Sequence, residues 1–406
     1  MRIRRHLLAA TVTLSLAATM GAAPTPAQPP PGDIETGAAM AVAWQRIAVR
    51  TIYTEGLQAP PVGTLYLAFT SLAVHDAARA AHGNVNRSRA AVATAAHDVL
   101  LEYFSTTSAA NLHDDLTATL DAIPDGPAES RGIRIGARAA AAMIASRVDD
   151  GRDDMSIVYS KPKKPGNWQP PEGGVMAAAW LGFVDPIVHI RKVRLDGPDR
   201  LRSAAYAEDY DEVRDLGSLE DSDRTQHQTD VALFFSFNPN AMFRTALCDL
   251  LTDEPMGLRR TTRLFSEIDA AVATTFIRTW RLKYDVGFWR PFEAVAGAAG
   301  DGNPATAPET GWVSLVATPA YSDYTSGHAA GTAPFATVLR AALGDDVSLH
   351  LENPALGTER DYTSLTDLEH DALHARIWGG LHFRDAMDDG YTLGHKTARR
   401  VVQALR

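Results

Sequence analysis

The chain of 406 residues contains a single cysteine, Cys248, so no disulfide can form within it. After about residue 23, no apolar run approaches the roughly 20 residues of a helix that spans a bilayer. Basic residues are also outnumbered by acidic ones, 39 against 49, which gives a formal net charge of −10. Such a chain is poorly suited to binding nucleic acid. We therefore expect a soluble protein that is stabilised by an apolar core and binds no nucleic acid.

The first 27 residues have the pattern of a secretory signal peptide. Three arginines lie within the first five residues, an apolar stretch follows to about residue 23, and a Pro-rich run comes next. A cut after Ala27 fits the small residues preferred at cleavage sites. The adjacent Arg4 and Arg5 also leave the twin-arginine export route open beside the general secretory route. We expect a secreted protein whose mature form, without these three arginines, has a net charge of −13.

Most of the remaining sequence shows helical periodicity. The predicted helical stretches are 38–81, 89–122, 127–148, 203–216, 221–237, 241–295 and 327–343. The segment 151–202 is instead rich in proline, with Trp168 and Trp180, and is predicted to be an ordered excursion packed on the helices. No sustained alternation of β-branched or aromatic residues occurs. The sequence predicts an all-α fold of two packed helical bundles.

The predicted organisation has four parts. Residues 1–27 form the signal peptide and 28–37 a Pro-rich linker. Residues 38–230 form an N-terminal helical half that includes the excursion, and 231–406 form a C-terminal bundle. The residues with the strongest chemical signal all lie in this last part.

Three short segments carry that signal. They are Lys283 to Pro291 with Arg290, then Ser326-Gly327-His328, then Arg376 to His382. Two guanidinium groups, an ammonium group, a hydroxyl and a glycine N–H are the donors that a tetrahedral oxyanion needs. Of the two imidazoles, one can bond to the central atom and the other can move protons. Together the segments predict an oxyanion site in the C-terminal bundle.

The first two segments have simple geometric interpretations. Lys283 and Arg290 are seven residues apart, so on one helix they would face the same way, and Pro291 would end or kink that helix. Ser326 and Gly327 stand where an Ala-rich helix would begin. A helix start offers free N–H groups and the positive end of the dipole to an anion.

The third segment needs a break in its helix. Arg376 and His382 would lie about 240° apart on a continuous helix, so we expect Gly379-Gly380 to interrupt it and turn His382 back. Each segment alone also has an ordinary structural explanation: a solvated face of charges, a serine cap, and a hydrogen-bonded core histidine. The order and spacing of all three favour the site.

In this order the segments resemble the superfamily shared by vanadium-dependent haloperoxidases and type 2 phosphatidic acid phosphatases or acid phosphatases. The resemblance implies that His382 is the axial metal ligand of a vanadate cofactor and that His328 is a catalytic base. It also implies the residues that hold the vanadate oxygens: Lys283, Arg290, Ser326, Gly327 and Arg376.

The chain departs from the superfamily pattern at three flanking positions. Thr325 stands where the family has Pro, Ala375 where it has Ser, and Ala386 where it has an Asp. Asp385 and Asp388 lie close to that last position. The residue that orients His382 is therefore left open.

Two further similarities favour the haloperoxidase branch. The mature chain is long, and its N-terminal half is similar to exported bacterial haloperoxidase-like proteins, notably in Gly166–Pro171 and Ser203–Tyr206. Trp280, three residues before Lys283, and Tyr321 fall where the family carries halide-pocket residues. The resemblance then implies that hydrogen peroxide oxidises a halide to a hypohalous-acid-like species, which halogenates a small organic acceptor. Related enzymes are often homodimers.

Other functions stay open at this stage. In a secreted phosphomonoesterase His382 would attack phosphorus and His328 would protonate the leaving oxygen. A relative without turnover would only bind the oxyanion. His370 and His374 have the i, i+4 spacing of zinc ligands, but the zincin pattern has Glu where this chain has Asp371, and no third ligand is evident.

Overall fold

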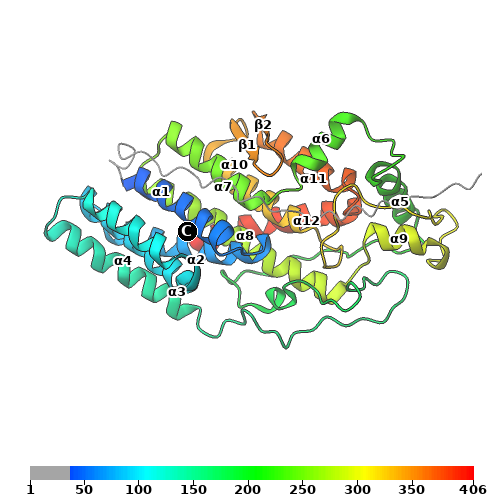
Figure 1. Ribbon diagram of the computed structural model, residues 1–406, viewed down its shortest axis with the longest axis horizontal. Helices are drawn as coiled ribbons and strands as arrows, with labels where there is room; N and C mark the ends of the chain where they lie inside the picture. The colour runs from blue at the N-terminus through cyan, green and yellow to red at the C-terminus, as the bar shows by residue number, and fades with distance from the viewer. Residues whose placement is uncertain (1–36) are drawn as a thin grey trace, which may run out of the picture.

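The computed structural model describes residues 37–406. The predicted signal peptide, and the predicted linker except for its last residue, lie outside the described residues. The first helices are α1 (Gly37–Val49), the π-helical turn η2 (Arg50–Glu55), α2 (Pro60–Ala80), α3 (Val85–Asp121) and α4 (Pro127–Ser146). Helix α3 packs along α4 and α2, and α1 packs on α3. These helices form one end of the elongated molecule (Figure 1).

Local sequence signals explain where these helices begin. Pro60 and Pro127 occupy first-turn positions, where their missing N–H costs nothing. The Asn84 side chain accepts a hydrogen bond from the Arg87 N–H and so caps α3. The helix predicted over 38–81 is interrupted at 56–59, because Pro60 starts a new helix and cannot continue the preceding one.

The rest of the chain adds the second bundle. Its elements are the 3₁₀ turn η3 (Ala179–Phe183), α5 (Ala204–Gly217), α6 (Gln226–Phe234), α7 (Pro239–Asp253), α8 (Leu258–Val286), α9 (Pro291–Gly297), η4 (Ala298–Gly300), α10 (Gly327–Leu343), β1 (Leu349–Asn353), β2 (Thr358–Tyr362), α11 (Leu365–Trp378) and α12 (Arg384–Leu405). The long helix α8 lies centrally: it packs on α2 of the first bundle and on α10 and α12 of the second. The predicted all-α fold of two packed bundles is confirmed.

Two details of the second half differ from the prediction. The helix predicted over 241–295 is broken twice, at 254–257 and at 287–290. The antiparallel hairpin of β1 and β2 was not predicted. In β1 only Leu349, Leu351 and Asn353 alternate as buried positions. Three alternating positions are too short a pattern to distinguish a strand from a turn.

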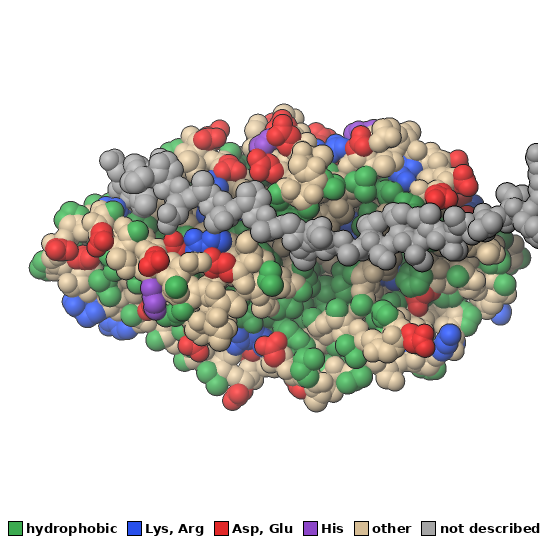
Figure 2. Space-filling view, viewed as in Figure 1, with side chains coloured by type: hydrophobic (Ala, Val, Ile, Leu, Met, Phe, Trp, Pro, Cys, Tyr) green, Lys and Arg blue, Asp and Glu red, His purple; other side chains and the backbone are tan. Residues whose placement is uncertain are grey.

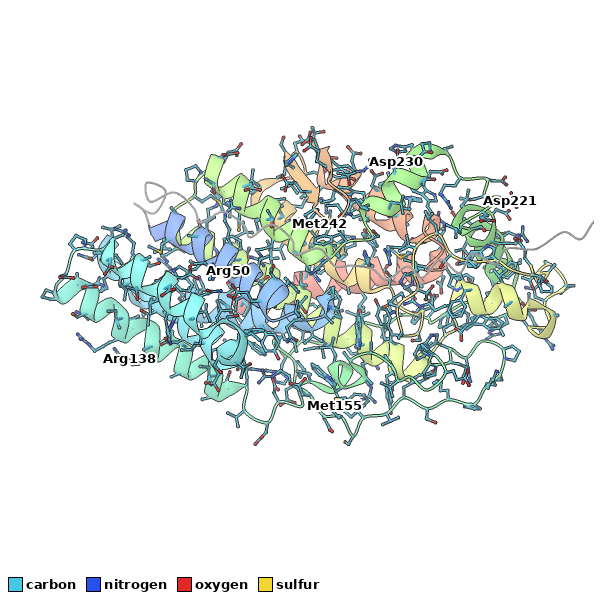
Figure 3. The ribbon with its side chains drawn as sticks, viewed as in Figure 1. Arg50, Arg138, Met155, Asp221, Asp230 and Met242 are labelled. Atoms are coloured by element: carbon cyan, nitrogen blue, oxygen red, sulfur yellow. The ribbon has the colours of Figure 1, made fainter. Side chains whose placement is uncertain are left out.

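The excursion 151–202 runs along one edge of the molecule, where Met155 is labelled in Figure 3. Backbone hydrogen bonds attach it to the second bundle. The Trp168 N–H donates to the Gly287 carbonyl (2.9 Å), and the Ala177 N–H donates to the Ala320 carbonyl (2.8 Å). The excursion therefore braces the two connections that follow α8 and precede α10.

A large apolar core extends through both bundles, and a second, smaller cluster lies around Tyr206, Phe288 and Phe383. Cys248 is buried in α7, and burial raises the pKa of its thiol to about 11. The face in Figure 2 shows acidic side chains scattered among fewer basic ones. Within residues 37–406, no helix combines the length and apolar character that crossing a bilayer requires.

Candidate oxyanion site

Lys283 and Arg290 do not share a helix, so that prediction is wrong. Helix α8 ends because Gly287 takes the left-handed conformation (φ 58°), and Pro291 starts α9. Arg290 lies in the connection between the two helices. Both cations still converge, because Lys283 Nζ lies 4.9 Å and Arg290 Cζ lies 5.0 Å from the centre of the Tyr321 ring.

The serine and glycine of the second segment lie at the start of α10, as the sequence predicts. Ser326 is the N-cap, and its hydroxyl accepts a hydrogen bond from the Ala329 N–H (3.4 Å). Gly327 is the first helical residue. A Cβ at this position would lie 3.4 Å from the Trp280 ring. The first turn therefore presents free backbone N–H groups and the positive end of the helix dipole.

The glycine break between Arg376 and His382 is present. Helix α11 ends at Trp378, and Gly380 has φ 73°. A Cβ at Gly380 would lie 2.4 Å from the Gly217 carbonyl oxygen, so only glycine fits. The chain turns back there, and His382 Nε2 comes within 3.2 Å of Nη1 of Arg290.

The three cations retain donors without a protein acceptor. Lys283 Nζ donates to the carbonyls of Ser322 (2.8 Å) and Asp323 (2.9 Å), which leaves one of its three N–H groups. Nη2 of Arg290 and Nε of Arg376 are buried and have no hydrogen-bond partner within the described residues. A buried donor without a partner is costly. The arrangement indicates that an acceptor of several hydrogen bonds belongs here.

The local charge balance leads to the same conclusion. Lys283, Arg290 and Arg376 are at most 4% exposed. Two carboxylates lie near Arg290: Asp323 has its Oδ1 3.8 Å from Nη1 of Arg290, and Glu293 accepts from the Arg290 backbone N–H (2.9 Å). Burial lowers the pKa of Lys283 well below its ordinary value, and the neighbouring Arg290 lowers it further. Burial also lowers the pKa of both arginines. A bound anion would offset this surplus of positive charge.

His328 lies on the first turn of α10 and is partly exposed. Its Nε2 lies 3.1 Å from the Phe235 carbonyl, which also accepts a hydrogen bond from Nη1 of Arg376 (3.2 Å). Burial lowers the pKa of His328 well below its ordinary value, and Arg376 lowers it further. The ring is therefore neutral at pH 7. Because Nε2 donates to the carbonyl, Nδ1 is left as an acceptor.

The sequence analysis missed the partner of His382, which is Asp323. His382 Nδ1 and Asp323 Oδ1 lie 2.7 Å apart, and both side chains are buried. Burial raises the pKa of Asp323 to about 8 and lowers that of His382 well below its ordinary value. The only signal in the sequence is an aspartate three residues before Ser326. Its burial could not be inferred.

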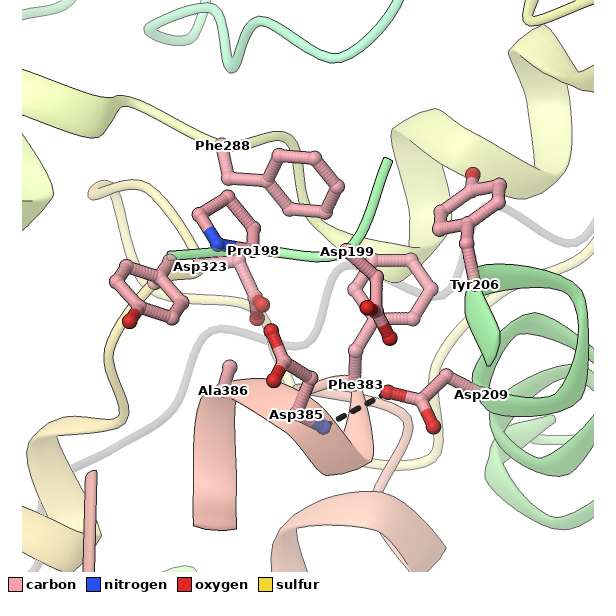
Figure 4. A pocket seen from close by; sticks show the side chains of 10 residues that line it. Pro198, Asp199, Tyr206, Asp209, Phe288, Asp323, Phe383, Asp385 and Ala386 are labelled. Atoms are coloured by element: carbon pink, nitrogen blue, oxygen red, sulfur yellow. Dashed lines mark hydrogen bonds between the residues drawn. The ribbon is translucent and has the colours of Figure 1, made fainter. Parts of the chain in front are cut away.

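The aspartates considered from the sequence do not bond to His382. The Asp385 backbone N–H donates to the Asp209 carboxylate at 2.7 Å (Figure 4). Asp388 is exposed. Neither residue has a hydrogen bond to the imidazole, so Asp323 is its carboxylate partner among the described residues.

Trp280 and Tyr321 lie next to Lys283, with ring centroids 4.9 Å apart. The Trp280 Nε1–H donates to the Ala177 carbonyl (3.1 Å), so the indole presents its ring and not its donor. The Lys283 Nζ is 5.8 Å from the Trp280 ring centre. Their role in binding a halide stays a prediction.

His370 and His374 lie ring to ring on α11, with centroids 4.2 Å apart. His370 is exposed, and His374 Nδ1 hydrogen-bonds to the His370 carbonyl. Within residues 37–406, no group of three His, Cys, Asp or Glu side chains is placed to hold a metal ion.

Residues 263–406 match the family described as the VCPO second helical-bundle domain. This stretch includes the three cations and both histidines of the site. The chain is similar to that family over this stretch. No curated protein sequence matches the chain at a significant level.

The similarity in fold to solved structures extends beyond this stretch to nearly the whole chain. A bacterial vanadium-dependent iodoperoxidase has a TM-score of 0.75 at 19% identity, over 91% of this chain and 96% of that one. The holo form of a bacterial vanadium-dependent chloroperoxidase has a TM-score of 0.67 at 16% identity, over 87% and 93% of the two chains. At this identity the similarity establishes the fold.

Proposed function

We propose that this protein is a vanadate-dependent haloperoxidase, which uses hydrogen peroxide to oxidise a halide to a hypohalous-acid-like halogenating species. The observation that carries the proposal is the buried surplus of positive charge around His382, with donors that lack protein acceptors. The fold shared with an iodoperoxidase and a chloroperoxidase supports the peroxidase branch. The N-terminal signal predicted from the sequence supports a secreted enzyme.

The residues present fit vanadate. Arg290 and Arg376 would donate to its oxygens from their unpartnered nitrogens, and Lys283 from its remaining N–H. The Ser326 hydroxyl and the Gly327 N–H, at the start of α10, would also donate to the vanadate oxygens. His382 would hold the metal itself through its Nε2. Vanadate, when bound, would supply a Lewis-acidic vanadium centre that activates hydrogen peroxide. The oxidation state of the vanadium would not change.

The nitrogen through which His382 would bind the metal is Nε2. An arginine has only donors, so the 3.2 Å contact between Nη1 of Arg290 and Nε2 of His382 requires Nε2 to be an acceptor. The proton then lies on Nδ1, which donates to Asp323. The lone pair of Nε2 therefore faces the cluster of cations.

His328 is placed to move the peroxide proton. It is neutral, and its Nδ1 is left as an acceptor once Nε2 donates to the Phe235 carbonyl. It can accept one proton from hydrogen peroxide and later return it. The remaining Lys283 N–H can donate to the peroxide oxygen that the halide attacks. Trp280 and Tyr321 would form the apolar wall beside that oxygen.

A phosphomonoesterase remains the second candidate because of one observation. The hydrogen bond from Nδ1 to Asp323 would orient His382 equally well as a nucleophile towards phosphorus. In that case vanadate would be an inhibitor and not a cofactor.

The two functions are separated by one experiment. The metal-free protein is given hydrogen peroxide, bromide, chloride or iodide, and a diketone indicator, before and after addition of orthovanadate. A parallel sample receives an aryl phosphate. Halogenation that requires vanadate and is blocked by phosphate supports the haloperoxidase. Phosphate-ester hydrolysis that vanadate inhibits, without halogenation, would assign the site to the phosphatase branch.

A further inference from the structure

We propose that Asp323 is the positioning residue of His382 and replaces the carboxylate that the superfamily pattern places at position 386. The inference rests on the proposed oxyanion site. It concerns this chain in particular, because residue 386 is an alanine here.

The contacts of Asp323 link it to three segments of the site. Its carboxylate accepts a hydrogen bond from His382 Nδ1 (2.7 Å). Its backbone N–H donates to the Phe288 carbonyl (2.9 Å), and its own carbonyl accepts from Lys283 Nζ (2.9 Å). The residue is fully buried, so its position is fixed by these contacts. The imidazole is thereby held at a set angle to the cations.

Position 386 is adjacent to the same point in the fold. The Ala386 carbonyl accepts a hydrogen bond from the Ser326 N–H (2.9 Å), which holds the start of α12 against the start of α10. Ala386, Asp323 and Asp385 line one small cavity. In Figure 4 the Ala386 methyl group points into this cavity, towards the Asp323 carboxyl group.

The size and lining of this cavity explain why a carboxylate at position 323 is not combined with one at position 386. An aspartate at 386 would place a second carboxyl group beside that of Asp323, and two neighbouring buried carboxyl groups cannot both ionise without strong repulsion. The cavity already holds Asp385, whose carboxyl group points towards Asp323 in Figure 4. A chain with Asp323 is therefore best served by a small residue at 386. The two positions are alternatives for the same function.

Four variants test the proposal: Asp323→Ala, Asp385→Ala, Ala386→Asp, and Asp323→Ala combined with Ala386→Asp. Asp385→Ala is the matched control, since it removes a carboxylate from the same cavity but none that bonds to His382. Circular dichroism and thermal unfolding first identify the variants that fold. Two ligands are then titrated calorimetrically, orthovanadate and sulfate. Sulfate uses the hydrogen-bond donors but forms no bond to the His382 nitrogen.

Asp323→Ala is expected to weaken orthovanadate binding about 10–100-fold, the usual effect of removing the partner of a ligating histidine. Sulfate binding should change less than about threefold, and Asp385→Ala should bind orthovanadate like the unmodified protein. The double variant should recover most of the loss. Ala386→Asp alone should weaken orthovanadate binding, because it adds a repulsive charge. A recovery of binding in the double variant could then not be explained by a generally favourable effect of Asp at position 386.

Three results would overturn the proposal. Asp323→Ala could bind orthovanadate as tightly as the unmodified protein, or it could lose both ligands equally. The double variant could also fail to recover orthovanadate affinity, which would show that a carboxylate at position 386 cannot replace Asp323. Because binding is measured and not turnover, an unmodified protein that binds orthovanadate but oxidises no halide would refute only the proposed function. An unmodified protein that binds sulfate but not orthovanadate would refute both.

Discussion

Two buried charge clusters in this protein are built on opposite principles. In the first, Arg244 of α7 binds Asp269 of α8, and it also donates to Gln45 (3.2 Å). Gln45 donates to Ser71 (2.9 Å), whose hydroxyl donates to Asp269. This closed network has one cation and one anion, and its four side chains hydrogen-bond to one another.

The second cluster is open. Lys283, Arg290 and Arg376 are as deeply buried as Arg244, yet of these three only Arg290 forms an ion pair within the described residues, with Asp323. Arg290 and Arg376 also keep unpartnered N–H groups. A closed cluster can act as a structural element between helices. In an open cluster, the free-energy cost of burying unpaired cations is offset only when an anion binds. The comparison therefore separates structural from functional buried charge, and four predictions test it.

The largest effect is expected at His328, the proposed catalytic base of the open cluster. His328→Ala should lower the rate of halide oxidation about 10²–10⁴-fold, the usual contribution of a general base. Orthovanadate affinity should stay within about threefold, because the imidazole is neutral and adds no charge to the cluster. Steady-state kinetics and a binding titration on the same preparation check both values. Equal loss of binding and turnover would contradict the assigned role.

Breaking the closed network should destabilise the fold. Arg244→Leu leaves the Asp269 carboxylate buried without its cation, and such a change typically costs about 3–5 kcal/mol of unfolding free energy. Urea unfolding measures the loss. The control is Arg244→Met combined with Asp269→Leu, which removes both charges and should recover most of the stability. A single variant as stable as the unmodified protein would show that the network is not structural.

Removing a cation from the open cluster should have the opposite effect: it should weaken anion binding without destabilising the fold. Arg376→Gln should weaken sulfate binding about 10–100-fold, as expected for hydrogen bonds to a charged group. The unfolding free energy of the anion-free protein should not fall, because an unpaired buried charge has been removed. Arg340→Gln is the control, since Arg340 on the same bundle is already paired with Asp345 and Glu369. If Arg376→Gln destabilised the anion-free fold as Arg244→Leu does, the comparison would fail.

The smallest effect is a pH dependence of anion binding. The pKa of Lys283 is lowered by burial, so the ammonium group loses its proton at a lower pH than an ordinary lysine. Sulfate keeps its charge between pH 6 and 8, and Arg376, whose pKa burial lowers to about 9, stays largely protonated in this range. Its affinity should therefore fall as the pH rises through this range, by roughly tenfold for one lost charge contact. Lys283→Met should bind weakly at every pH and show no such step. A step that persists in this variant would assign the titration to another group.

The sequence was sufficient for the parts of the fold and site that depend on local signals. The Ala-rich periodicity gave the helices, Ser326 gave the start of α10, and Gly379-Gly380 gave the break after α11. These features are determined within one helical turn. The order of the three segments also brought Lys283, Arg290 and Arg376 into one candidate site.

What the sequence could not provide depends on contacts between distant segments. The seven-residue spacing suggested that Arg290 lies on the same helix as Lys283. That helix ends before Arg290 because Gly287 adopts a left-handed conformation, which the spacing does not reveal. Asp323 was missed because a loop aspartate is normally solvated, and only the packing of His382 and Phe288 around it makes it a buried partner. The Phe235 carbonyl, which binds both His328 and Arg376, has no side-chain signal at all.

The most direct test of the account is a calorimetric titration of the metal-free protein with orthovanadate, alone and in the presence of phosphate. We expect one site per chain, competition by phosphate, and a loss of binding in Arg290→Gln and Arg376→Gln. The result that would contradict the account is the absence of a saturable site, or a site whose affinity these two substitutions leave unchanged. The unpaired cations would then be structural, and the contrast between the two clusters would have no functional meaning.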